Sequence, residues 1–107
     1  NESLFLRAEA AFHRAVKLAP HVEVHHFWLG LSRYQRHQYN KAETSFFEAL
    51  QHNPKDEANH YWLGKCLHKQ GKFPEAIASL KMAVSLQPND PVNHKALSIC
   101  IAEKMMD

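Results

Sequence analysis

Small and hydrophobic residues recur along the chain at the spacing of an α-helix. One stripe falls at i, i+3, i+4 and i+7 and consists of His26, Leu29, Gly30 and Arg33. The next stripe consists of Ala42, Ser45, Phe46, Ala49 and Leu50. Such positions share one face of a helix because the helical period is 3.6 residues. The two stripes therefore predict two consecutive helices.

The same spacing continues through the chain and predicts an all-α fold of about six antiparallel helices. The expected ranges are 3–19, 23–37, 41–52, 57–70, 74–87 and 91–106. Five Pro and only three Gly leave little room for the frequent turns of a β-sandwich.

The pair of helices belongs to a repeating unit. Residues 23–56 align with residues 57–90 without a gap. The residues of the first segment that have an identical counterpart in the second are Glu23, His26, Trp28, Leu29, Gly30, Ala42, Ser45, Ala49, Pro54 and Asp56. Half-length matches extend the period in both directions. We therefore expect one repeat domain over 1–107, made of a half repeat (1–22, second helix only), two full repeats (23–56 and 57–90) and a half repeat or capping helix (91–107).

Helix boundaries carry their own chemical signals. A proline ends each repeat, at Pro20, Pro54 and Pro88. Asp56 and Asp90 are placed to cap the helices that follow. Asn40, with Glu43 three residues later, has the form of an N-cap and capping box, and Gly71 followed by Pro74 marks the same turn in the second repeat.

The pattern H-x-x-L-G…A-x-x-x-F…P in 23–56, and its counterpart with Leu in place of Phe in 57–90, resembles the tetratricopeptide repeat. The resemblance implies a right-handed helix-turn-helix solenoid whose first helices line a concave groove that binds peptides or helices of partner proteins. Gly30 and Gly64 would let paired helices approach closely. Arg33 departs from the family pattern, so we expect either looser packing around it or a side chain that reaches water.

The resemblance also implies which side chains face the groove. Carried over by position, they are Phe27, Trp28, Leu31, Tyr34, Tyr61, Trp62, Lys65, His68, Lys69, Lys95 and Ile99. These residues make an aromatic and mildly basic groove, suited to an amphipathic or extended peptide with some acidic residues. The family's carboxylate clamp is not matched, because only Lys95 fits it.

Two alternatives stay open for these residues. Trp28 and Trp62 are large apolar side chains at helical spacing, and such residues are often buried between repeats. The lysines Lys65, Lys69 and Lys95 are equally explained as a solvated face.

Composition limits the class of partner. Thirteen Lys and Arg against eleven Asp and Glu give a net charge of +2, far from that of a dedicated nucleic-acid binder. No apolar run approaches the roughly 20 residues of a membrane span. We expect a soluble chain, with the cytoplasm slightly favoured, and the absence of an initiator Met before Asn1 is what we expect of a piece of a longer protein.

The residue types that carry chemistry do not form a recognisable site. His21 and His25 lie at i, i+4, but no further ligand in the same helical pattern completes a metal site. His26, His60 and His94 recur one repeat apart, which favours stacking and hydrogen bonding between helices. Cys66 and Cys100 are also one repeat apart, too far for a disulfide, and are expected to be buried packing residues. We expect no enzyme activity, no metal and no cofactor.

Three functions are compatible with these features. The first is a protein-interaction module or scaffold that binds a peptide or helix of another protein in its groove. The second is a structural segment that stacks on further repeats or on a second copy through its terminal helices. The third is a targeting module for a catalytic domain elsewhere in the parent protein.

Overall fold

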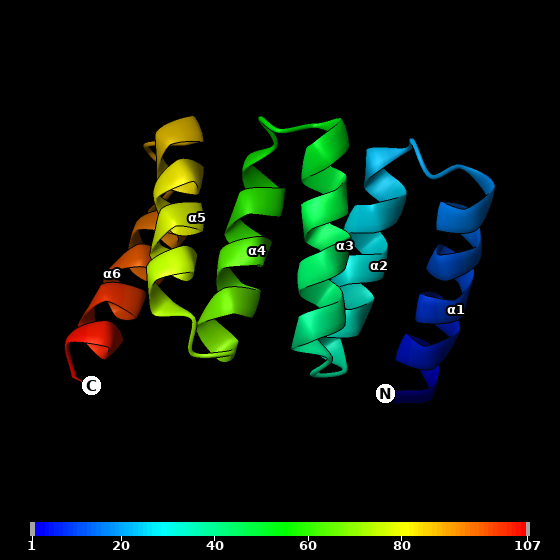
Figure 1. The fold of residues 1–107 in the computed structure, drawn as a ribbon, viewed down its shortest axis with the longest axis horizontal. Helices are drawn as coiled ribbons and strands as arrows, with labels where there is room; N and C mark the ends of the chain where they lie inside the picture. The colour runs from blue at the N-terminus through cyan, green and yellow to red at the C-terminus, as the bar shows by residue number, and fades with distance from the viewer. Residues whose placement is uncertain (1, 107) are drawn as a thin grey trace. The chain divides into compact units, whose positions relative to one another are not determined.

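The computed structural model describes residues 2–106, with all side chains in that range except those of residues 2 and 5. Helices joined by short turns make up the described chain, and no strand occurs in it (Figure 1). The helices are α1 (Glu2–Leu18), α2 (Glu23–Gln35), α3 (Tyr39–His52), α4 (Glu57–Lys69), α5 (Phe73–Leu86) and α6 (Pro91–Met105). All six predicted helices are confirmed, with ends within two residues of the expected positions.

The helices form two compact units that divide after Pro54. In the first unit α2 and α3 pack as a hairpin, and α1 packs on α2. In the second unit α4 and α5 form the equivalent hairpin, and α6 packs on α5 and also touches α4. Figure 1 shows each hairpin with its two helices side by side. The single-domain organisation proposed from the sequence stays a prediction.

Glycine permits the close approach within each hairpin. A Cβ atom at Gly30 would lie 2.8 Å from the ring of Phe46, and one at Gly64 would lie 2.7 Å from Cγ of Leu80. Both distances are shorter than van der Waals contact, so only a residue without a side chain fits at this spacing. This confirms the packing role that the sequence assigned to the two glycines.

Each unit has its own buried centre. In the first unit it is formed by Leu29, Ala42, Phe46, Ala49 and Leu50. In the second unit Leu67, Ala76, Leu80 and Cys100 form one cluster. Cys66 and Cys100 are both fully buried free thiols, as the repeat spacing predicted.

The capping predictions are confirmed at two positions and wrong at a third. The Asp56 carboxylate accepts a hydrogen bond from the backbone N–H of Asn59 at 3.2 Å, and Asp90 accepts one from that of Val92 at 2.9 Å. Asn40 is not an N-cap, because α3 begins one residue before it and Gln38 occupies the cap position without a side-chain bond.

The turn before α3 explains the earlier start. His37 adopts a left-handed backbone with φ of 61°, and the N–H of Gln38 donates to the carbonyl of Arg33 at 2.9 Å. The same geometry recurs one repeat later, where Gly71 has φ of 75° and Lys72 donates to Leu67. The left-handed residue reverses the chain, so the next helix starts within two residues.

Two of the three repeated histidines, His26 and His94, have the structural role that the sequence indicated. His26 Nε2 lies 2.7 Å from the carbonyl oxygen of Pro20, and His94 Nε2 lies 2.6 Å from that of Pro88. A carbonyl oxygen only accepts, so Nε2 carries the hydrogen in both rings. Each bond ties the first turn of a repeat to the proline that ends the preceding one.

Candidate interaction surface

In the first unit the predicted groove residues lie on one side of α2. Trp28 is 46 % exposed, and Val24, four residues earlier on the same helix face, is 45 % exposed, whereas Leu29 and Gly30 are buried. The ring of Trp28 stacks on Phe12 of α1 at 6.1 Å between centroids and meets Phe27 edge-on at 5.4 Å. Trp28 is therefore held by aromatic contacts but is not part of the buried core.

The other predicted residues of α2 are partly buried. Phe27 meets the core residue Phe46 edge-on at 5.9 Å, and Tyr34 meets Tyr39 of α3 at 5.2 Å. Leu31 is also partly buried. Only part of each side chain is thus available to a partner.

In the second unit Tyr61 has a larger share in the core than the sequence suggested. Its side chain packs against the cluster formed by Leu67, Ala76, Leu80 and Cys100. Burial raises the pKa of Tyr61 above its usual value of 10.0, and the negative charges of Asp90 and then Glu57 add to the effect. The partly buried Trp62 meets Tyr61 edge-on at 5.2 Å.

Two further predicted residues of α4, Lys65 and His68, have different neighbours. Nζ of Lys65 lies 6.0 Å from the centroid of the Tyr61 ring, at the outer limit of a cation–π contact. His68 Nε2 lies 3.0 Å from a carboxylate oxygen of Glu103, which joins α4 to α6. The remaining predicted residues, Lys69, Lys95 and Ile99, are exposed.

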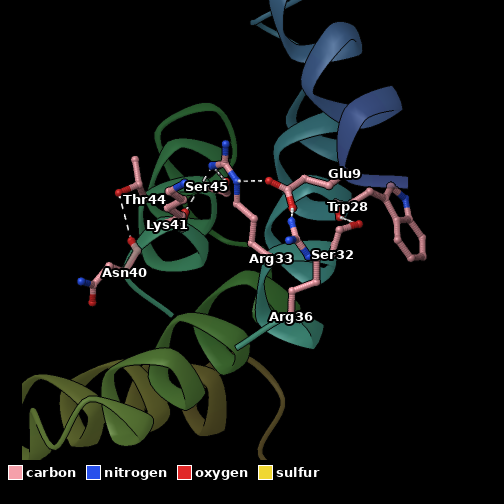
Figure 2. A network of polar contacts seen from close by, with 9 residues as sticks. All are labelled: Glu9, Trp28, Ser32, Arg33, Arg36, Asn40, Lys41, Thr44 and Ser45. Carbon is pink, nitrogen blue, oxygen red and sulfur yellow. Dashed lines mark hydrogen bonds and ion pairs between the residues drawn. The ribbon is translucent and has the colours of Figure 1, made fainter. Parts of the chain in front are cut away.

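The sequence missed a polar network in the first unit that is centred on Glu9 of α1 (Figure 2). The Glu9 carboxylate contacts Arg36 at 2.5 Å and Arg33 at 3.7 Å. Arg33 also donates to the hydroxyl of Ser45 at 2.8 Å and to the carbonyl of Lys41 at 3.4 Å. In Figure 2 the ring of Trp28 points away from these guanidinium groups.

The side chain of Arg33 is only 15 % exposed, so it turns toward its polar partners and does not extend into water. The looser packing expected around Arg33 stays a prediction. Burial lowers the pKa of the Arg33 guanidinium, while the charge of Glu9 and its hydrogen bond act in the opposite direction. One feature of the sequence pointed to this network: Arg33 stands at a repeat position where the other repeats have the apolar residues Leu67 and Ile101.

Two other kinds of site are absent from the described residues. No three side chains of the His, Cys, Asp and Glu types come together there in a way that would hold a metal ion. No helix within 2–106 has the length and apolar character needed to cross a membrane.

The chain contains helical hairpins whose two helices meet at a small residue. These hairpins recur at a fixed period, and a proline ends each repeat. These features define a helical-repeat protein. Residues 33–98 match the family model described as "Tetratricopeptide repeat". The chain belongs to the tetratricopeptide repeat family. A comparison with curated proteins found no significant match.

Solved structures share this fold. The Yersinia enterocolitica type III secretion chaperone SycD, in complex with a peptide of the translocator YopD, is 21 % identical with a TM-score of 0.87, over 95 % of this chain and 83 % of that one. MamA from Desulfovibrio magneticus RS-1 is 22 % identical with a TM-score of 0.90, over 95 % of this chain. A Thermobaculum terrenum O-GlcNAc transferase mutant is 29 % identical with a TM-score of 0.84, over 91 % of this chain.

The chain spans 58 % of the MamA chain and 19 % of the transferase chain. The family and these neighbours support a protein–protein interaction module. Repeats of this family are generally non-catalytic, and the transferase is an enzyme that contains this fold in a small part of its length.

Proposed function

We propose that the chain binds a peptide or helix of a partner protein on the faces of α2, α4 and α6 that carry the predicted groove residues. One observation carries the proposal. Trp28 and Val24 keep nearly half of their surface exposed on a helix that buries His26, Leu29, Gly30 and Ser32. Rigidly held aromatic side chains with accessible surface are the usual anchors of protein interfaces.

The chemistry of each face indicates what the partner presents. On α2 the accessible groups are aromatic and aliphatic, which suits large apolar anchors. Lys69 of α4 and Lys95 of α6 are exposed, and α4 also carries Lys65. Acidic residues in the partner would complement this charge and speed association. We infer an amphipathic or extended ligand with apolar anchors and acidic residues.

The SycD structure supports the proposal, since that protein has this fold and is seen with a peptide of its translocator. The two sequences are 21 % identical, so the similarity concerns the fold and does not identify the ligand of this chain.

The proposal can be tested with peptides selected on the full chain from a random display library. We expect the selected peptides to lose about tenfold or more in affinity for Trp28→Ser and for Lys65→Glu. Matched controls are Phe47→Ser and Lys81→Glu, which change an exposed aromatic residue on α3 and an exposed lysine on α5. If the selected peptides bind both groove variants as tightly as the unmodified chain, these helix faces are not the binding site.

Self-association is a second candidate, favoured by apolar side chains on the outer helices. Leu18 of α1 is 86 % exposed and Met105 of α6 is 79 % exposed. Such residues would be covered by a second copy or by further repeats. Sedimentation velocity over a range of concentrations tests this, and a monomer at every concentration would exclude the second copy.

A third candidate is a role in positioning a catalytic domain of a longer protein. It is supported by the O-GlcNAc transferase, an enzyme that contains this fold.

A further inference from the structure

A pocket of about 370 Å³ lies on α1 beside the C-terminal end of α2, within the first unit. Its lining consists of Leu6, Glu9, Ala10, His13, Arg14 and Arg36. None of these residues belongs to the predicted groove. The pocket combines an apolar wall with cationic groups, which is typical of sites that hold an amphipathic group.

The charges of the lining do not cancel. Glu9 is the acidic member, and its carboxylate is already shared by Arg36 and by Arg33 behind it. Arg14 is exposed and has no ion-pair partner among the side chains that the structure describes. A negative group entering the pocket would therefore meet an unpaired guanidinium, and Leu6 and Ala10 would contact an attached hydrocarbon stem.

The occurrence of Glu9 together with Arg14 on one helix is specific to this part of the chain. Two repeats later, the positions equivalent to Glu9 and Arg14 hold Ile77 and Met82. The repeat fold alone therefore does not require these charges, because the equivalent helix α5 packs on α6 without them.

We propose that this pocket binds an acidic side chain of a partner protein, a carboxylate on an aliphatic stem as in glutamate. The carboxylate pairs with Arg14 and the stem lies on Leu6 and Ala10. The site is separate from the groove, so a partner that uses both would contact two different faces of the first unit.

Backbone amide NMR of the full chain, titrated with sodium hexanoate, tests the proposal directly. We expect saturable shifts confined to residues around 6–14 and 36, weaker binding of acetate, and no equivalent shifts with hexanol. Arg14→Gln should weaken hexanoate about threefold to fivefold, the range of an exposed ion pair. Lys17→Gln removes a neighbouring exposed charge of α1 outside the lining and should leave binding unchanged.

Three results would overturn the assignment. They are the absence of saturable shifts at these residues, equal binding by the Arg14→Gln variant, and tighter binding of inorganic phosphate than of hexanoate. The last would indicate a phosphate group as the ligand. Because the probe and the variants avoid the predicted groove, failure here leaves the groove proposal untouched, and the reverse also holds.

Discussion

A carboxylate oxygen of Glu9 lies 2.5 Å from Nη1 of Arg36, and this pair joins α1 to the end of α2. The side chains of both residues are only 18 % exposed. Arg33 adds a second guanidinium to the same carboxylate and continues through Ser45 to α3. One carboxylate thus connects three helices of the first unit.

We expect Glu9→Gln to lower the free energy of unfolding by about 1–2 kcal/mol, because two partly buried guanidinium groups lose their counter-charge. Urea denaturation monitored by circular dichroism measures the change. Glu48→Gln is the matched control, since Glu48 is an exposed acid on α3, and a change within about 0.5 kcal/mol is expected there. Equal stability of the two variants would show that the network contributes nothing measurable.

The helices and their packing were predictable because they depend on a periodic signal. Gly30 and Gly64 occupy equivalent positions in successive repeats, and so do the large residues Phe46 and Leu80 that meet them. Close approach of two helices imposes the same requirement in each repeat, so comparing the chain with itself reveals it.

Contacts that occur once could not be predicted in this way. Arg33 and Glu9 lie in different helices, and the repeat period does not relate their positions. Asn40 was misread because its cap-like spacing to Glu43 ignored the left-handed His37, a conformation uncommon outside glycine. The depth at which the ring of Tyr61 enters the core could not be predicted either, because the family position of a residue does not reveal it.

The left-handed turn residues give a paired prediction of opposite signs. Gly71 has φ of 75°, and an added Cβ would meet no atom within 4 Å. Gly71→Ala should therefore lower the free energy of unfolding by about 1 kcal/mol through backbone strain alone. His37→Gly relieves the same strain but loses the 2.6 Å contact of His37 with the hydroxyl of Tyr39, so we expect a gain of about 0.5 kcal/mol.

Thermal and urea unfolding of both turn variants measure these changes. Tyr39→Phe, combined with His37→Gly, separates the lost hydroxyl contact from the backbone effect. A stabilised Gly71→Ala variant would contradict the strain argument.

At Gly64 the obstacle is steric. A Cβ there would lie 2.7 Å from Cγ of Leu80 and 3.4 Å from the carbonyl oxygen of Ala76. Overpacking costs about 1–3 kcal/mol, more than the roughly 1 kcal/mol that alanine gains over glycine as a helix former. We expect Gly64→Ala to be less stable than the unmodified chain in urea unfolding.

A second substitution tests the steric cause at Gly64. Adding Leu80→Val, which removes a methylene from the facing side chain, should cost less in the Gly64→Ala background than in the unmodified chain. Strict additivity of the two changes would point to a cause other than the contact with Leu80.

Tyr61 gives a prediction at alkaline pH. Burial, together with the charges of Asp90 and Glu57, raises its pKa above 10.0 in the folded chain. Above that pH the unfolded chain releases the phenol proton while the folded chain still holds it, so unfolding becomes more favourable. The stabilisation is complete below pH 10 and is lost as pH rises toward the folded-state pKa.

The free energy of unfolding of the unmodified chain should therefore fall relative to Tyr61→Phe between about pH 10 and pH 11.5. The same difference, measured in urea between about pH 7 and pH 9, should not change with pH. A difference that stays constant through the alkaline range would contradict the raised pKa of Tyr61.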